Sequence, residues 1–256
     1  MGKIGNLELN RIYQMDCIEG MRLLPDESVD LIIADPPYNI GGKSNRFEVK
    51  NEIINFSTIR ESWDMIDDFD EFNYTWLSEC YRVVRQGGSL IVWGTRHNIF
   101  SVGYLLEKIG LEIRTLYVWH KRNPMPCLTG RNPTEATEFA IWATKGKRWT
   151  YNLDVAKELN GGKNIRNVIE TTITPPSEKT KGKHPSQKRL SGLTDVLIKL
   201  HSNEGDIILV PFCGSGTECV AAVKENRHFI SFERESKYIE IANKRLENVW
   251  DELKSV

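Results

Sequence analysis

Four consecutive residues, Asp35-Pro36-Pro37-Tyr38, combine groups that suit a planar base carrying an exocyclic amine. An ionised Asp35 only accepts hydrogen bonds, and the carbonyl oxygen of Pro36 is a second acceptor, whereas such an amine offers two N–H donors. The two prolines fix φ and remove two backbone donors, so the turn is stiff and presents acceptors. The ring of Tyr38 could stack on the base. The alternative is a turn in which aspartate and proline only end a strand.

A second cluster lies later in the chain, between an apolar run at residues 206–210 and a helical pattern that begins at Thr217. Its sequence is Pro211-Phe212-Cys213-Gly214-Ser215-Gly216. Glycines let a backbone approach a ligand closely, and a helix N-terminus offers free N–H groups to it. Glu233 ends the next apolar run, where a carboxylate can bind a ribose diol. Taken singly, the glycines also fit a tight turn that only packs a helix, and Glu233 also fits an exposed acid.

The elements that must position these groups follow from hydrophobic periodicity. Strands are predicted at residues 11–16, 29–34, 89–93, 111–119, 138–143, 206–210 and 228–232. Helices are predicted at residues 69–85, 98–109, 187–201, 217–226 and 237–249, with C-caps at Gly87-Gly88, Gly110 and Gly205. This alternation indicates an α/β fold with a doubly wound, mostly parallel seven-stranded sheet and helices on both faces. Such sheets bind ligands at the carboxyl ends of their strands, which is where Asp35 stands.

Two segments depart from the alternation, at residues 39–63 and 121–185, and both are rich in glycine, polar and basic residues. Loops of this length in a compact domain are usually functional or disordered. We therefore expect residues 1–256 to form one domain in which both segments are inserted loop regions that face the substrate.

Composition bounds the class of protein. The 256 residues are 40% hydrophobic, which is enough to bury a substantial core. With a net charge of −1, any nucleic-acid surface must be a local patch. The five cysteines are scattered without metal-ligand spacing, which indicates free thiols in a reducing compartment and no metal site. No signal-peptide core and no bilayer-spanning run is present, so we expect a cytoplasmic protein with no membrane partner.

The two clusters and their order resemble the β-class amino-methyltransferases of DNA, in which Asp-Pro-Pro-Tyr precedes the S-adenosylmethionine-binding Phe-x-Gly-x-Gly in a circularly permuted arrangement. The resemblance runs through nearly the whole chain. It includes Asp16-Cys17, Ser28-Val29-Asp30, Gly87-Gly88-Ser89-Leu90 and His184-Pro185-Ser186-Gln187-Lys188. In this family, Asp-Pro-Pro-Tyr is the form associated with N6 of adenine rather than N4 of cytosine. The loops look most like those of small adenine methyltransferases of restriction-modification systems, which implies a prokaryotic or phage-encoded protein.

This resemblance implies the S-adenosylmethionine-dependent methyltransferase fold and site-specific transfer of a methyl group to N6 of a flipped-out adenine. The catalytic residues would be Asp35, Pro36, Pro37 and Tyr38. The cofactor-binding residues would be Asp16, Cys17, Asp35, His184, Ser186, Lys188, Pro211, Phe212, Gly214, Ser215, Gly216, Thr217 and Glu233. Two of these have an alternative structural role, because Asp16 could cap a strand end and Ser186 could cap a helix N-terminus.

DNA is the implied partner, double-stranded in the first place, with single strands left open. Basic residues of the long loops are the expected contacts: Lys43, Arg46, Lys121, Arg122, Arg131, Lys145, Lys147, Arg148, Lys179, Lys181 and Lys183. The acidic stretch at residues 64–71 should face away from DNA or cap the helix that begins near Phe69. A homodimer and a cognate restriction endonuclease acting on the same site stay open as further partners.

Three positions depart from the family pattern. Val210 stands where an aspartate is usual, Glu218 where a small or hydroxyl residue is usual, and Arg189 where proline is commoner. These changes bear on cofactor affinity more than on base chemistry. The alternative functions are an N4-cytosine DNA methyltransferase and a non-catalytic, DNA-binding, methyltransferase-like subunit.

Overall fold

The computed structural model describes residues 2–40, 44–49, 52–57, 61–127 and 130–255. Its main sheet has eight strands in the order β10-β8-β9-β7-β4-β11-β12-β3. The strands are β3 (Arg11–Gln14), β4 (Val29–Ala34), β7 (Val84–Gly94), β8 (Glu112–Lys121), β9 (Thr137–Thr144), β10 (Val168–Thr171), β11 (Ile207–Val210) and β12 (His228–Glu233). β9 is antiparallel to β7 and β8, and the other neighbouring pairs are parallel. The predicted mostly parallel α/β sheet is confirmed.

Both faces of the sheet are buried, as the central strand shows. In β4, Ile32 and Ala34 belong to one hydrophobic cluster, whereas Leu31 and Ile33 belong to a second. Successive side chains of a strand point to opposite faces, so one continuous apolar run supplies two cores. This explains why a strand with no polar alternation lies at the centre of the fold.

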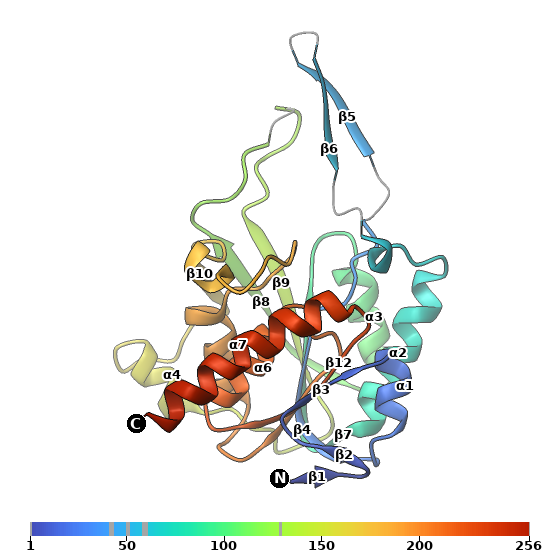
Figure 1. The fold of residues 1–256 in the computed structure, drawn as a ribbon. Coiled ribbons are helices and arrows are strands. Elements are labelled where there is room, and N and C mark those ends of the chain that lie inside the picture. Colours follow the sequence, from blue (N-terminus) through green and yellow to red (C-terminus); the bar gives the residue numbers. More distant parts are fainter. Residues whose placement is uncertain (1, 41–43, 50–51, 58–60, 128–129, 256) are drawn as a thin grey trace.

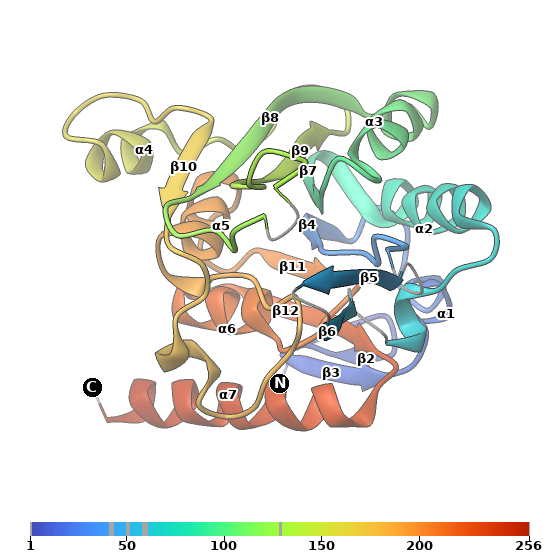
Figure 2. The ribbon, with the colours of Figure 1, turned by 90° about the horizontal axis from the view of Figure 1, so that it is seen from above.

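Two sets of helices cover the two faces (Figures 1 and 2). The first cluster includes side chains of α1 (Cys17–Arg22), α2 (Phe69–Val83) and α3 (Ile99–Lys108). The second includes side chains of α5 (Asp195–His201), α6 (Thr217–Lys224) and α7 (Ser236–Lys254). Seen from above in Figure 2, the sheet lies between the two sets. Helices on both faces are therefore confirmed.

Three further strands and one α-helix lie in the segments that were expected to be loops. β5 (Ser44–Val49) and β6 (Glu52–Ser57) form an antiparallel hairpin, which rises from the body of the molecule in Figure 1. α4 (Leu153–Leu159) and β10 belong to the second segment. β10 pairs with β8 and makes the sheet eight-stranded rather than seven-stranded. The hydrophobic pattern of so short an edge strand, Val-Ile-Glu-Thr, is too brief to distinguish it from a loop.

The remaining elements are short. β1 (Lys3–Ile4) and β2 (Leu7–Glu8) form a hairpin, and η1 (Ser62–Asp64), η2 (Pro176–Lys179) and η3 (Leu190–Thr194) are single turns. The helix predicted at residues 187–201 is interrupted within η3, because Ser191 is extended and Gly192 has φ +76°. None of the helices within the described ranges combines the length and the apolarity needed to cross a membrane.

Two of the three predicted glycine C-caps are wrong. Gly87 and Gly88 lie inside β7, and Gly205 lies in the turn before β11, whereas Gly110 does follow the last turn of α3 with φ +99°. A side chain at position 88 would come within 2.9 Å of the carbonyl oxygen of Asp30. Close approach of two strands, rather than a helix end, therefore requires glycine there.

Candidate active site

The two sequence clusters meet at one cavity of about 440 Å³. β4 and β11 are parallel neighbours, with Leu31 opposite Ile208, so Asp35 and Pro211 leave the sheet side by side. All of the predicted catalytic and cofactor residues line this cavity except Gly216. Long-range strand pairing therefore brings together groups that are far apart in the sequence, as the carboxyl-end rule predicts.

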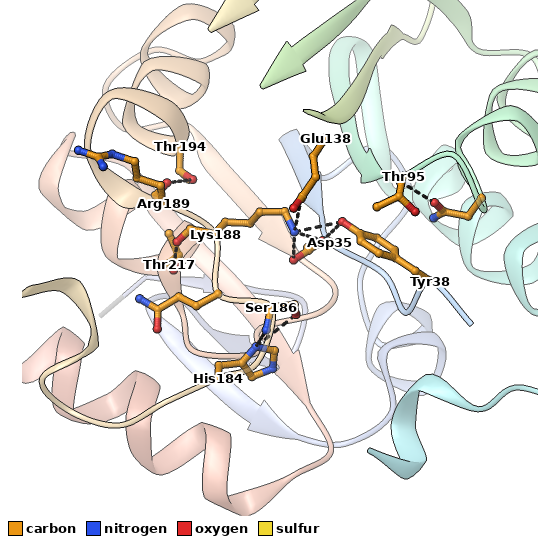
Figure 3. A network of polar contacts seen from close by, with 12 residues as sticks. Asp35, Tyr38, Thr95, Glu138, His184, Ser186, Lys188, Arg189, Thr194 and Thr217 are labelled. Carbon is orange, nitrogen blue, oxygen red and sulfur yellow. Dashed lines mark hydrogen bonds and ion pairs between the residues drawn. The ribbon is translucent and has the colours of Figure 1, made fainter. Parts of the chain in front are cut away.

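The carboxylate of Asp35 is held by a buried lysine (Figure 3). Lys188 Nζ donates to both Asp35 oxygens at 2.7 Å and to the Tyr38 hydroxyl at 3.0 Å. That hydroxyl donates in turn to Asp35 Oδ1 at 2.6 Å. The sequence placed Lys188 at the carboxylate of the cofactor, and its ammonium lies on the carboxylate of Asp35.

A second carboxylate shares this lysine. Glu138 on β9 lies 3.3 Å from Lys188 Nζ, and Lys121 on β8 also pairs with Glu138. Sequence analysis did not single out Glu138, because a glutamate at the start of an antiparallel strand carries no local signal. The result is an alternating set of two carboxylates and two ammonium groups that includes Asp35 of the Asp-Pro-Pro-Tyr motif.

Burial and the neighbouring charges shift the pKa values of Asp35 and Lys188 in opposite directions. Burial raises the pKa of Asp35, and the Lys188 ammonium with its hydrogen bonds opposes that rise. For Lys188, burial alone would lower the pKa, but the carboxylates of Asp35 and Glu138 raise it well above its ordinary value. The lysine is therefore charged at neutral pH, and it stabilises the ionised form of Asp35.

Asp64 fixes the loop that follows the prolines. Its carboxylate accepts from the backbone N–H groups of Tyr38, Asn39 and Ile40 at 2.7–2.9 Å, and its side chain is 1% exposed. We expected this acid to face away from DNA or to cap a helix, and Asp64 does not cap the helix. Asp68 does cap α2, by accepting from the N–H of Glu71. Nothing local in the sequence links Asp64 to Tyr38.

The glycine loop needs both of its glycines for conformation and space. Gly214 has φ +50° and Gly216 has φ +74°, in the left-handed region. A Cβ at position 214 would lie 3.2 Å from the His184 ring, and one at 216 would lie 2.7 Å from Ala242. Gly216 thus serves the packing of α6 on α7, whereas Gly214 lies on the cavity.

Arg245 supports the loop from behind. From α7 it donates to the carbonyl and hydroxyl oxygens of Ser215 and to the hydroxyl of Thr217. The two hydroxyls are thereby engaged by a buried cation. Sequence analysis missed Arg245, because helical periodicity gives no reason to separate it from the other charged residues of α7.

Two more acids, Glu233 and Asp16, line the cavity. Glu233 accepts from the backbone N–H groups of Gly214, Arg234 and Glu235, and burial raises its pKa. Asp16 is the N-cap of α1 and accepts from Ile18 and Glu19 through Oδ1. The predicted strand at residues 11–16 ends at Gln14, so Asp16 caps a helix rather than a strand end.

His184 and Ser186 lie beside the glycine loop. The His184 ring stacks on Trp63 and packs edge-on against Tyr238. Burial, together with nearby cations, lowers the pKa of His184 to about 3, so the ring is neutral at physiological pH. Ser186 does not cap a helix, because η3 begins only at Leu190.

The departures from the family pattern have different environments. Val210 is fully buried in the second hydrophobic cluster and does not line the cavity. Glu218 lines the cavity and is 4% exposed. Arg189 donates to the Thr172 hydroxyl and to the carbonyl of Ser191, which ties the segment after Lys188 to the residues after β10.

The predicted DNA contacts fall into two groups. Lys145, Lys147 and Arg148 follow β9, whose last residue, Thr144, pairs with Glu112 at the start of β8, so they lie at the sheet edge opposite the cavity. The expectation that they flank the site is wrong, and Lys145 is also buried, donating to the carbonyls of Tyr81 and Val84. The error arose because antiparallel β9 reverses which loop reaches the carboxyl edge.

The other candidates follow strands that end at the cavity edge. Lys121 is engaged by Glu138, Lys179 is partly buried, and Arg122, Arg131, Lys181 and Lys183 are exposed. Arg46 is part of β5, and Lys43 lies outside the described residues.

Comparison with known proteins identifies the family. Residues 29–244 match the family model described as DNA methylase. Type II methyltransferase M2.DpnII of Streptococcus pneumoniae is 40% identical over 92% of this chain and 89% of its own length. Type II methyltransferase M2.MboI of Moraxella bovis is 36% identical over 95% of this chain and 90% of its own length.

Solved structures agree. The crystal structure of the M1.HpyAVI–SAM complex superimposes with a TM-score of 0.69 at 29% identity, covering 92% of this chain and 98% of that chain. The cytosine-N4-specific PvuII DNA methyltransferase has the same fold, with a TM-score of 0.71 at 16% identity over 94% of this chain and 89% of that chain. The chain belongs to the DNA methylase family and is an S-adenosylmethionine-dependent DNA methyltransferase.

Proposed function

We propose that this enzyme methylates N6 of adenine at a specific DNA sequence, as the modification enzyme of a restriction-modification system. The observation that carries the proposal is the largely buried Asp35 carboxylate beside the glycine loop, both oxygens of which lie 2.7 Å from Nζ of Lys188. A carboxylate that is kept ionised can accept a hydrogen bond from the amine of the base. It would thereby hold the amine nitrogen toward the methyl group of the cofactor.

Hydrogen-bond capacity supports Asp35 and Pro36 as the amine acceptors. A carboxylate has about four lone-pair sites. Asp35 Oδ1 accepts from Lys188 and Tyr38, whereas Oδ2 accepts from Lys188 and keeps capacity for one amine hydrogen. The Pro36 carbonyl would accept the other hydrogen. Both bonds draw electron density onto the amine nitrogen and fix its orientation for in-line transfer.

The target base must leave the helix to reach this site. Flipping a base out of a duplex costs a few kcal/mol, and stacking in a pocket offsets part of that cost. Tyr38 lines the cavity, and its hydroxyl is held by Asp35 and Lys188. We propose its ring as the stacking surface for the flipped adenine.

The remaining cavity residues suit the cofactor. Bound S-adenosylmethionine supplies the methyl group on a sulfonium, which is an activated leaving group. Glu233 and Asp16 are acceptors for the hydroxyls and the adenine amine, together with Cys17 beside Asp16. Pro211, Phe212, Gly214, Ser215 and Thr217 would line the methionine and ribose, with His184 and Ser186 at the methionine end.

We propose the carboxyl edge of the sheet as the DNA surface. The β5–β6 hairpin and the connection between β8 and β9 rise on this side of the molecule in Figure 1. The segment between β10 and η3 carries the exposed Lys181 and Lys183 on the same edge. These parts would contact phosphates and read the recognition sequence.

A methylation assay with nucleoside analysis tests the proposal. DNA is incubated with the protein and methyl-labelled S-adenosylmethionine and then digested to nucleosides. We expect labelled N6-methyladenine, and at least a thousandfold slower reaction with Asp35→Ala. Label in N4-methylcytosine instead would establish cytosine as the target base. This outcome is tested because a cytosine-N4-specific enzyme has the same fold. Cofactor binding without any labelled base would favour the non-catalytic subunit.

Homodimerisation and a companion nuclease complete the proposal. α3 buries Val102 and Leu106 but exposes Phe100 and Tyr104, which gives a second copy an apolar and aromatic surface. Sedimentation of the wild type and of Phe100→Glu would detect a dimer there. A restriction endonuclease of the same site should fail to cut DNA that this enzyme has modified.

A further inference from the structure

Glu218 is a buried acid with an unused acceptor. It lies in the first turn of α6, lines the cavity and is 4% exposed. Its Oε1 atom has no hydrogen-bond partner among the residues that the structure describes. A buried, unsatisfied acceptor is costly, so a ligand that brings a donor to this atom would be favoured.

The nearby cations are engaged elsewhere. An ammonium has three donors, and Lys188 directs its own to the two oxygens of Asp35 and to the Tyr38 hydroxyl. Arg245 donates to Ser215 and Thr217. Neither cation forms an ion pair with Glu218 in the described structure. The hydrogen bonds of both cations therefore go to other groups, and Oε1 of Glu218 is left as an open acceptor on the cavity.

The chemistry of the missing partner follows from the acceptor. S-adenosylmethionine carries two positive centres, the sulfonium and the α-ammonium of its amino-acid end. Only the ammonium can donate hydrogen bonds. We propose that Glu218 binds the α-ammonium group of S-adenosylmethionine, and thereby sets the affinity for the amino-acid end of the cofactor. The inference rests on the cofactor and is independent of which DNA base is methylated.

The electrostatics give this contact a pH dependence. Burial and the neighbouring Asp35 raise the pKa of Glu218 to about 7, while Lys188 and Arg245 oppose the rise. An ammonium bound to the ionised carboxylate lowers that pKa, so binding releases a proton at neutral pH. The carboxyl would be about nine-tenths protonated near pH 6 and about nine-tenths ionised near pH 8. Affinity should therefore rise about tenfold between these pH values through this group.

Calorimetric titration of the full chain without DNA tests the contact. The ligands are S-adenosylmethionine, S-adenosylhomocysteine and 5′-deoxy-5′-methylthioadenosine, of which the last lacks the amino-acid end and the second lacks the sulfonium. Glu218→Gln keeps the side-chain shape, and Glu225→Gln is the control at the far end of α6, where Glu225 pairs with Lys199.

We expect Glu218→Gln to bind S-adenosylmethionine and S-adenosylhomocysteine at least tenfold more weakly near pH 8, with methylthioadenosine unchanged. Proton release, measured in buffers of different ionisation enthalpy, should be smaller than in the wild type. Unchanged binding of all three ligands would overturn the proposal, and so would weaker binding of S-adenosylmethionine alone, which would indicate the sulfonium. Equal weakening of methylthioadenosine would show a structural role. A wild type that binds none of the ligands would instead contradict the cofactor assignment.

Discussion

Each oxygen of Asp35 lies 2.7 Å from Lys188 Nζ, so the chemistry of this carboxylate depends on the lysine. Burial raises the pKa of Asp35, and the ammonium opposes that rise. If methyl transfer needs ionised Asp35, activity falls as pH drops through its pKa. Without the cation this pKa moves higher, and the acid-side loss of activity moves to higher pH.

We therefore predict that Lys188→Met shifts the acid limb of the kcat profile upward by at least about one pH unit, equivalent to about 1.4 kcal/mol. The KM for DNA should change much less than kcat. Lys199→Met, which also removes an ion pair but lies outside the cavity, should keep the wild-type profile. An unshifted acid limb in Lys188→Met would contradict the role of this lysine.

Removing Lys188 also leaves Asp35 and Glu138 facing each other, and breaking a buried pair in this way typically costs about 3–5 kcal/mol. The double variant Lys188→Met with Glu138→Gln removes one carboxylate with the cation and should recover part of that loss in thermal unfolding. It should keep the shifted pH profile, because Asp35 still lacks its ammonium. Stability and catalysis are thereby separated.

Asp64 provides a second prediction. Three backbone N–H groups after the prolines donate to its carboxylate, so Asp64→Ala leaves them without this acceptor. We expect a loss of about 1–3 kcal/mol in unfolding free energy and at least a tenfold fall in kcat, with cofactor affinity little changed. Asp67→Ala, an exposed acid of the same stretch, is the control and should match the wild type. Normal kcat in Asp64→Ala would show that the loop holds its conformation without this carboxylate.

At the scale of elements, the β5–β6 hairpin is the part whose removal should separate DNA binding from cofactor binding. It rises away from the body of the molecule (Figure 1). We predict that replacing residues 44–57 with a short glycine-serine linker weakens binding of specific DNA at least tenfold and leaves the affinity for S-adenosylhomocysteine within about twofold, because a few tenths of a kcal/mol is the usual effect of a distant surface change.

A replacement of the exposed residues 160–164, which follow α4, serves as the matched control. DNA affinity should not change in that variant. If the hairpin replacement binds specific DNA as tightly as the wild type does, the recognition function belongs to another part of the carboxyl edge.

Periodicity predicted the elements that carry a long apolar signal. β4, β7, β11 and β12 lie where the sequence placed strands, and the parallel pairing of β4 with β11 brings Asp35 beside the glycine loop. The hairpin and β10 were missed because their patterns are short, and their positions depend on partners elsewhere in the chain. The residues of each motif are consecutive in the sequence, so their chemistry could be predicted from the sequence alone.

The residues that support the motifs could not be predicted, because their partners are distant in the sequence. Asp64, Glu138 and Arg245 act on groups that are 17 or more residues away, and a lone charged residue has no spacing to recognise. The placement of Lys188 also needed the structure, since its position in the motif indicated a cofactor contact and its ammonium lies on Asp35. Long-range charge pairing is therefore the part of this site that could not be predicted from a single sequence.

At the scale of the whole molecule, the net charge is −1, so attraction to DNA must come from the distribution of charge. Strand direction separates two pairs of exposed basic residues. Lys181 and Lys183 lie on the cavity edge of the sheet, whereas Lys147 and Arg148 lie on the opposite edge. Replacing either pair with glutamate changes the net charge of the protein equally.

We predict that only the first replacement weakens DNA binding. Two lost phosphate contacts should reduce the slope of log affinity against log salt by about two, and affinity near physiological salt should fall at least about tenfold. Lys147→Glu with Arg148→Glu should retain the wild-type slope. Binding of S-adenosylhomocysteine, measured on both variants, separates a DNA effect from damage to the cavity. Equal weakening by the two pairs would mean that overall charge, rather than one face, governs the encounter with DNA.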